Sequence, residues 1–119
     1  INKRKLIAKE YIKKLSSTEL ELPTENLNCN HVYHLFTIYH AKAEKIKKKL
    51  LNFKIQTRSI YPYPIHKMKA YRSLIKNKQR LKNSEKKAKG IFCLPLYPEL
   101  NSFEVNKICF TLKKVLKEI

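Results

Sequence analysis

Residues 61–71 (YPYPIHKMKAY) combine tyrosines, a histidine and two prolines, and they are the first candidate for chemistry. Proline fixes the backbone angle φ near about −65°, so the prolines stiffen the chain on both sides of Tyr63. Such a loop can hold Tyr61, Tyr63 and His66 in place as hydrogen-bonding groups that bind a substrate. The alternative is a rigid connection whose aromatic rings lie in the core, and the residue types alone favour that alternative.

The motif Cys29-x-His31-x-x-His34 contains residue types that bind zinc. His31 and His34 stand three positions apart where a strand is predicted to begin, so their side chains should point to opposite faces. No second Cys or His pair lies nearby to complete four ligands, and we predict no metal site. A hydrolytic triad is poorly supported, because the chain has no Asp. The single glycine, Gly90, excludes a glycine-rich phosphate loop.

Lysines are dense at residues 42–49 and 76–89, and the whole chain carries a net charge of +18. This charge would attract any polyanion, including nucleic acid, anionic membrane and nucleotide phosphates. An AT-rich genome explains the composition without a function, since Lys, Asn and Ile are abundant and Gly is nearly absent. The aromatic residues are not interleaved with the basic runs, so we predict no specific nucleic-acid binding. A solvated helix face accounts for the first run, and the second stays open.

The length of 119 residues, 43% of them hydrophobic, suits one domain with a core. No stretch approaches the roughly 18 apolar residues of a membrane span, and no signal peptide is visible. Cys29, Cys93 and Cys109 lack CxxC spacing, which is typical of reduced thiols in a cytoplasmic protein. Because the chain begins with Ile1 and its one methionine is Met68, we expect a piece of a longer protein, from a truncated gene or a trimmed chain.

Hydrophobic periodicity predicts the elements that must position these groups. The predicted helices are residues 3–15, 41–51, from 66 or 67 to about 76, and 102–118; the strand candidates are 32–39, 54–61 and an apolar run at 91–96; residues 76–89 are part loop and part helix. Asn101 and Glu104 form the expected N-cap and capping box of the last helix. The pattern predicts one α+β domain, with a small antiparallel or mixed sheet and helices packed on it.

The strand at 32–39 is apolar on both faces, with Val32, Phe36 and Ile38 on one and Tyr33, Leu35 and Tyr39 on the other. A strand of this kind needs cover on both sides. We predict that the last helix packs its apolar face on this sheet. That face consists of Val105, Ile108, Leu112 and Val115.

Four segments, in this order, are similar to the carboxy-terminal part of the DegT/DnrJ/StrS family of sugar aminotransferases. They are residues 4–11 (RKLIAKEY), 31–38 (HVYHLFTI), 54–57 with 61–66 (KIQT and YPYPIH), and 84–85 with 93–100 (SE and CLPLYPEL). Each segment alone is weakly specific, whereas four at matching separations are strongly specific. The resemblance covers nearly the whole chain. It implies that residues 1–16 are a helix leaving a large domain and that residues 31–119 are the core of a small domain.

The resemblance implies the type I aminotransferase fold, in which the large domain binds pyridoxal phosphate through a Schiff-base lysine. That lysine and the acidic partner of the pyridinium nitrogen lie before the matched region, so no catalytic or cofactor-binding residue carries over to this chain. The parent activity would transfer an amino group from glutamate to a keto-deoxy sugar nucleotide, for lipopolysaccharide or another surface polysaccharide. We therefore expect this chain alone to be inactive, and its partners to be the large domain or a homodimer partner.

For substrate binding, the resemblance implies His66, with Tyr61 and Tyr63 beside the same cleft. Two positions depart from the family pattern. Ile60 stands where His is frequent, which weakens the expected substrate contacts. Lys54 stands where Gly is frequent, which indicates a changed turn or a relaxed constraint.

A competing interpretation is a basic module that binds a polyanion or a separately encoded large domain, and an independent enzyme ranks last. If the chain has lost a large domain, an apolar patch should be exposed where that domain would dock. Tyr11, Tyr61 and Tyr63 are the candidates for the edge of this patch.

Overall fold

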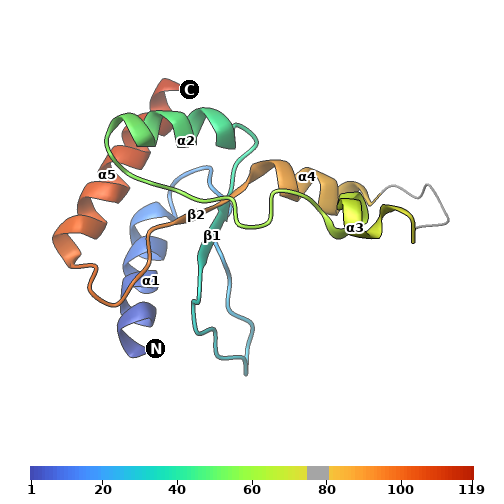
Figure 1. Cartoon of the computed structure of the whole chain (residues 1–119). Helices are drawn as coiled ribbons and strands as arrows, with labels where there is room; N and C mark the ends of the chain where they lie inside the picture. Colours follow the sequence, from blue (N-terminus) through green and yellow to red (C-terminus); the bar gives the residue numbers. More distant parts are fainter. Residues whose placement is uncertain (75–80) are drawn as a thin grey trace.

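The structure, a computed structural model, describes residues 1–74 and 81–119, and it is α+β as predicted (Figure 1). Its elements are α1 (Asn2–Leu15), β1 (Phe36–Tyr39), α2 (Ala43–Asn52), the 3₁₀ turn η1 (Ile65–Lys67), α3 (Lys69–Arg72), α4 (Lys82–Gly90), β2 (Ile91–Leu94) and α5 (Ser102–Glu118). Within the described residues, β1 and β2 form an antiparallel pair in which Phe36 lies opposite Leu94 and Tyr39 opposite Ile91. The same residues contain no helix that is both long and apolar enough to cross a membrane.

The strand predicted at 32–39 begins only at Phe36, because Tyr33 has a left-handed φ of 51°. Left-handed backbone cannot continue a strand, and the Tyr33 N–H instead donates to His31 Nδ1 at 2.9 Å. The reversal brings the Tyr33 ring into the core, where its centroid lies 6.2 Å from that of Phe36, and it leaves Val32 exposed. The predicted assignment of Tyr33 and Val32 to the strand faces is therefore wrong.

The strand predicted at 54–61 is also wrong. Its one ladder contact is an isolated bridge, in which the Arg58 N–H donates to the Cys93 carbonyl at 3.3 Å and the Cys93 N–H donates back at 2.7 Å. The segment begins at Lys54, whose φ is 62°, and it ends at Pro62, which has no N–H to donate. These two residues prevent a longer ladder.

Lys54 occupies the turn position after α2 that glycine favours. The Lys54 N–H donates to the Leu51 carbonyl at 2.8 Å and the Ile55 N–H donates to the Leu50 carbonyl at 3.0 Å. This pair of hydrogen bonds defines a Schellman motif with Lys54 in the left-handed position. The lysine therefore carries the backbone strain that glycine would avoid.

The capping box of α5 is confirmed. Asn101 Oδ1 accepts a hydrogen bond from the Glu104 N–H at 2.8 Å, and Glu104 Oε2 accepts one from the Asn101 N–H at 3.0 Å. The predicted face of α5 is buried, but it packs mainly on α1 and α2 rather than on the sheet. Strands of four residues cannot cover a helix of 17 residues, so helix side chains such as Leu15 and Ile46 complete the core.

Tyr11 lies in the middle of this core, with no exposed surface. Its ring centroid is 4.9 Å from that of Phe36, and its hydroxyl donates to the Pro95 carbonyl at 2.7 Å. Burial raises the pKa of Tyr11 above its usual range. The expectation that Tyr11 borders an exposed patch is wrong, because the tyrosine faces inward from an amphipathic helix that belongs to this domain.

Residues 61–74 and 81–90 project from the body as an arm that contains η1, α3 and α4 (Figure 1). Among the described residues, the hydrophobic core takes none between Ile55 and Phe92. The helix predicted from 66 or 67 to 76 is split into η1 and α3, and its end lies outside the described residues. Residues 76–80 of the lysine-rich stretch also lie outside them, and the rest of that stretch is mostly α4.

The arm joins the sheet at Gly90, the last residue of α4. A Cβ atom there would lie 2.3 Å from Tyr39 Cε2 and 2.7 Å from the His40 carbonyl oxygen. The Gly90 carbonyl accepts a hydrogen bond from the His40 N–H at 3.0 Å. Glycine is required because the backbones approach too closely for a side chain.

Candidate functional site

The proline loop turns His66 inward and leaves both tyrosines outward. Pro64 precedes η1, and its carbonyl accepts a hydrogen bond from the Lys67 N–H at 2.9 Å. This single turn directs the His66 side chain toward α4, so that only 13% of it is exposed. Tyr61 and Tyr63 are each 64% exposed, so the prediction that the rings of this loop lie in the core is wrong.

Tyr61, Tyr63 and His66 nevertheless line one cavity of about 720 Å³, here called the tyrosine groove. Its remaining walls come from η1, α3, α4 and their flanks, namely Pro64, Ile65, Met68, Tyr71, Leu74, Leu81, Ser84, Lys87, Ala88 and Ile91. The walls are mostly apolar, with a few hydroxyl, imidazole and ammonium groups. A mostly apolar groove with few polar groups is the usual form of a small-molecule site.

Behind the groove, His66 Nε2 lies 3.1 Å from Glu85 Oε1. The same carboxylate oxygen lies 3.5 Å from Lys67 Nζ. Glu85 is only 8% exposed, and it does not line the groove. A buried carboxylate needs such partners, because the loss of hydration would otherwise be costly. Sequence reasoning missed Glu85 as a site residue, since this contact joins positions 19 residues apart.

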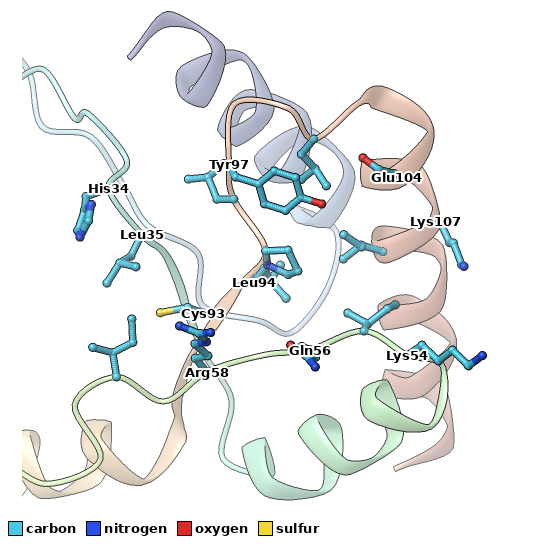
Figure 2. A pocket seen from close by; sticks show the side chains of 16 residues that line it. His34, Leu35, Lys54, Gln56, Arg58, Cys93, Leu94, Tyr97, Glu104 and Lys107 are labelled. Carbon is cyan, nitrogen blue, oxygen red and sulfur yellow. The ribbon is translucent and has the colours of Figure 1, made fainter.

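A second cavity, of about 580 Å³, lies on the body and was not foreseen from the sequence. Figure 2 shows Arg58 beside Cys93, with Glu104 and Lys107 on the facing helix. The floor of this basic cleft is apolar, and its charged rim is mainly cationic because Lys54 also lines it. The one acidic side chain on the rim, Glu104, is already used by the capping box.

Among the described residues, no lysine has the buried environment that favours a Schiff-base lysine. A Schiff-base lysine must lose its proton, and burial away from water promotes that loss. Every lysine of the described residues is exposed or half-buried. Burial raises the pKa of the Cys109 thiol to about 11, so this cysteine is not an activated nucleophile. Among the described ranges, no three Cys, His or Glu side chains gather in a way that could hold a metal ion.

Sequence comparison matches residues 1–113 to the DegT/DnrJ/EryC1/StrS aminotransferase family. A dTDP-3-amino-3,4,6-trideoxy-alpha-D-glucose transaminase from Micromonospora megalomicea is 27% identical over 95% of this chain. A 3-oxo-glucose-6-phosphate:glutamate aminotransferase from Bacillus subtilis is 31% identical over 98% of it. The chain spans only 32% and 28% of the lengths of these two enzymes.

Solved structures have the same fold. S. venezuelae DesV, solved in complex with a ketimine intermediate, superimposes with a TM-score of 0.92 and 24% identity, over 99% of this chain and 32% of that one. The B. subtilis protein ntda, solved with bound cofactor PMP, gives a TM-score of 0.83 and 31% identity, over 97% of this chain and 28% of that one. Because the sequence match extends over nearly all of its residues and the fold agrees, the chain belongs to the DegT/DnrJ/EryC1/StrS aminotransferase family.

Proposed function

We propose that this chain is the small domain of a pyridoxal-phosphate-dependent nucleotide-sugar aminotransferase, and that it forms one wall of the sugar cleft without taking a covalent part. The observation that carries the proposal is the tyrosine groove, where a loop similar to the family's brings Tyr61, Tyr63 and His66 together. Several relatives are named as transaminases of dTDP-linked or UDP-linked sugars. In the whole protein, the coenzyme would supply the electron sink for transfer of an amino group from glutamate to a keto sugar.

The groove offers the groups that a nucleotide-linked sugar requires. Aromatic faces such as those of Tyr61 and Tyr63 can cover the apolar C–H face of a sugar ring, and their hydroxyls can bind sugar oxygens. His66 adds an imidazole whose Nε2 already contacts the carboxylate of Glu85. Lys87 adds a positive charge at the same wall, which suits a sugar that carries a diphosphate.

The proposed domain division keeps residues 1–16 as the connecting helix and residues 31–119 as the small domain. In this structure α1 packs against α5, so the connecting helix and the small domain share one core. The proposed biological role is the synthesis of lipopolysaccharide or another surface polysaccharide. The proposed location is the cytoplasm, in keeping with the free thiols of Cys29, Cys93 and Cys109.

A chimera tests the proposal. This chain would replace the matching portion of the M. megalomicea enzyme, and transamination of its dTDP-sugar would be measured with glutamate as amino donor. We expect activity in the chimera, and a loss of at least about tenfold in kcat/KM when Tyr61 and His66 are both changed to Ala. An active chimera that tolerates this double change would refute the assignment of the groove, and a folded but inactive chimera would count against the family activity.

The isolated chain provides the complementary test. With pyridoxal phosphate, we expect no visible absorption band that borohydride fixes to one defined lysine, because no described lysine is buried. The intact M. megalomicea enzyme is the positive control. A band that maps to a single lysine of this chain would show that the chain attaches the coenzyme by itself, and would overturn the proposed division of labour.

The second candidate function is a module that binds a polyanion, or a separately encoded large domain, through the basic cleft. The cationic rim of that cleft and the net charge of +18 favour it. If the chain is an aminotransferase domain, charge alone should give binding that is weak, insensitive to sequence and lost near physiological salt, because such attraction arises from counterion release. One oligonucleotide that binds about a hundredfold tighter than its scrambled version at that salt would favour this function over the aminotransferase.

A further inference from the structure

The imidazole of His66 separates the carboxylate of Glu85 from the tyrosine groove. His66 lines the groove, whereas Glu85 is buried behind it and lines no part of it. The short contact of 3.1 Å uses Nε2 of the ring. The carboxylate can only accept a hydrogen bond, so Nε2 must be the nitrogen that carries the proton. The nitrogen that remains for a ligand is Nδ1.

We propose that Glu85 positions His66 in the Nε2–H tautomer, so that the Nδ1 lone pair accepts a hydrogen bond from a hydroxyl group of the bound sugar. The proposal rests on the proposed function for the identity of the ligand. A free imidazole exchanges its proton between both nitrogens, and a fixed partner on one nitrogen removes this ambiguity. Lys67, which lies 3.5 Å from the same carboxylate oxygen, offsets part of the buried negative charge.

Glu85 has a competing role as an acidic residue in the first turn of α4, where it stabilises the helix terminus. That role does not concern the tautomer of His66, so a measurement of the tautomer separates the two. The chain contains its own references. Nδ1 of His31 accepts from the Tyr33 N–H and Nδ1 of His40 accepts from the Lys42 N–H, each at 2.9 Å. These backbone donors fix both rings in the Nε2–H form without Glu85.

The first experiment is long-range ¹H–¹⁵N NMR of the full chain at about pH 8.5, where an ordinary imidazole is neutral. We expect the ring nitrogens of His66 to match those of His31 and His40. In Glu85→Ala they should shift to the averaged positions of mixed tautomers, while the two references stay unchanged. Glu85→Gln, whose amide can accept from or donate to Nε2, keeps the size of the side chain and should also give a mixture. Unchanged His66 signals in a folded variant, or a wild-type His66 with its proton on Nδ1, would overturn the proposal.

The second experiment measures KM for the dTDP-sugar in the chimera described above. Glu85→Gln should raise KM about twofold with kcat nearly unchanged, because a tautomer mixture leaves about half of the His66 rings able to accept from the sugar. His66→Ala should raise KM about five- to tenfold, which corresponds to one hydrogen bond to bound substrate, and adding Glu85→Gln should raise KM little more, because both changes act on the same interaction. Additive losses, or an unchanged KM in Glu85→Gln, would contradict the proposal.

Glu44→Gln is the matched control, because Glu44 pairs with Lys47 on α2 and contacts neither His66 nor the groove. It should leave both the His66 signals and KM unchanged. A wild-type chimera without activity would count against the proposed function, and the tautomer measurement would then decide on Glu85 alone.

Discussion

Replacing Lys54 by Gly should stabilise the chain. Lys54 has a φ of 62° and closes the Schellman turn after α2. In this conformation a residue with a Cβ atom destabilises the folded chain by about 1–2 kcal/mol, whereas glycine adopts it without strain. Glycine also gains about 0.5–1 kcal/mol of entropy in the unfolded chain, which opposes folding. The net expectation is a stabilisation of about 0.5–1 kcal/mol.

Lys48→Gly is the matched control, because it removes the same charge from a position nearby in the chain, within α2. Lys48 is exposed in the interior of α2, where glycine costs about 0.7 kcal/mol relative to lysine. The two variants should therefore differ by about 1.5 kcal/mol. With a slope of about 1.5 kcal/mol per molar urea, their unfolding midpoints should lie about 1 M apart.

Urea unfolding followed by far-UV circular dichroism measures both midpoints. The wild-type midpoint should lie between those of the two variants. Its distances from the two should differ by no more than about 0.3 M. If Lys54→Gly lowers the midpoint as much as Lys48→Gly does, the turn at Lys54 carries no backbone strain and the reasoning from its φ angle is refuted.

The remaining predictions concern the packing, the alkaline limit and the surface of the chain. Gly90→Ala should destabilise the chain by about 2 kcal/mol or more, since its Cβ would meet a side chain and a backbone carbonyl, and a drop in Tm measures this. Burial raises the pKa of Cys109 from 9.0 to about 11, so the thiol ionises more readily in the unfolded chain than in the folded one. The free energy of unfolding should therefore be at its full value below pH 9 and should fall as the pH rises toward 11. The loss is at most about 3 kcal/mol, and Cys109→Ala should show a shallower alkaline decline in urea titrations. The exposed Tyr61 and Tyr63 should make the isolated chain bind a hydrophobic dye, and changing both to Ser should weaken this binding; equal fluorescence would argue against a docking patch there.

The sequence predicts α1, α2 and α5 well, because their apolar positions recur at helical spacing and the cap of α5 consists of neighbours such as Asn101 and Glu104. The apolar run at 91–96 correctly contains β2, but the strand at 32–39 is predicted too long and the one at 54–61 does not form, because single backbone angles prevent the ladder. Tyr33 and Lys54 both have positive φ, which residue type alone does not reveal in a tyrosine or a lysine.

The candidate site could likewise be predicted only in part from the sequence. The prolines identify the loop that carries His66, since their effect on the backbone is local. Glu85 could not be found from the sequence, because its role depends on a contact between the loop and α4, and many exposed glutamates look the same in a sequence. The basic cleft is likewise built from distant segments that include Lys54, Arg58 and Lys107.

The arm has a consequence for how this protein can change during evolution. Among the described residues, the hydrophobic core includes none between Ile55 and Phe92, so the wall of the tyrosine groove and the stability of the body depend on different side chains. Most substitutions are rejected because they bring a protein below its stability threshold. Substitutions at the rim of the groove, such as those at Tyr63 or Ile65, should leave the stability of the body unchanged. Lineages can therefore alter the side chains of the arm while the helices and sheet of the body stay the same.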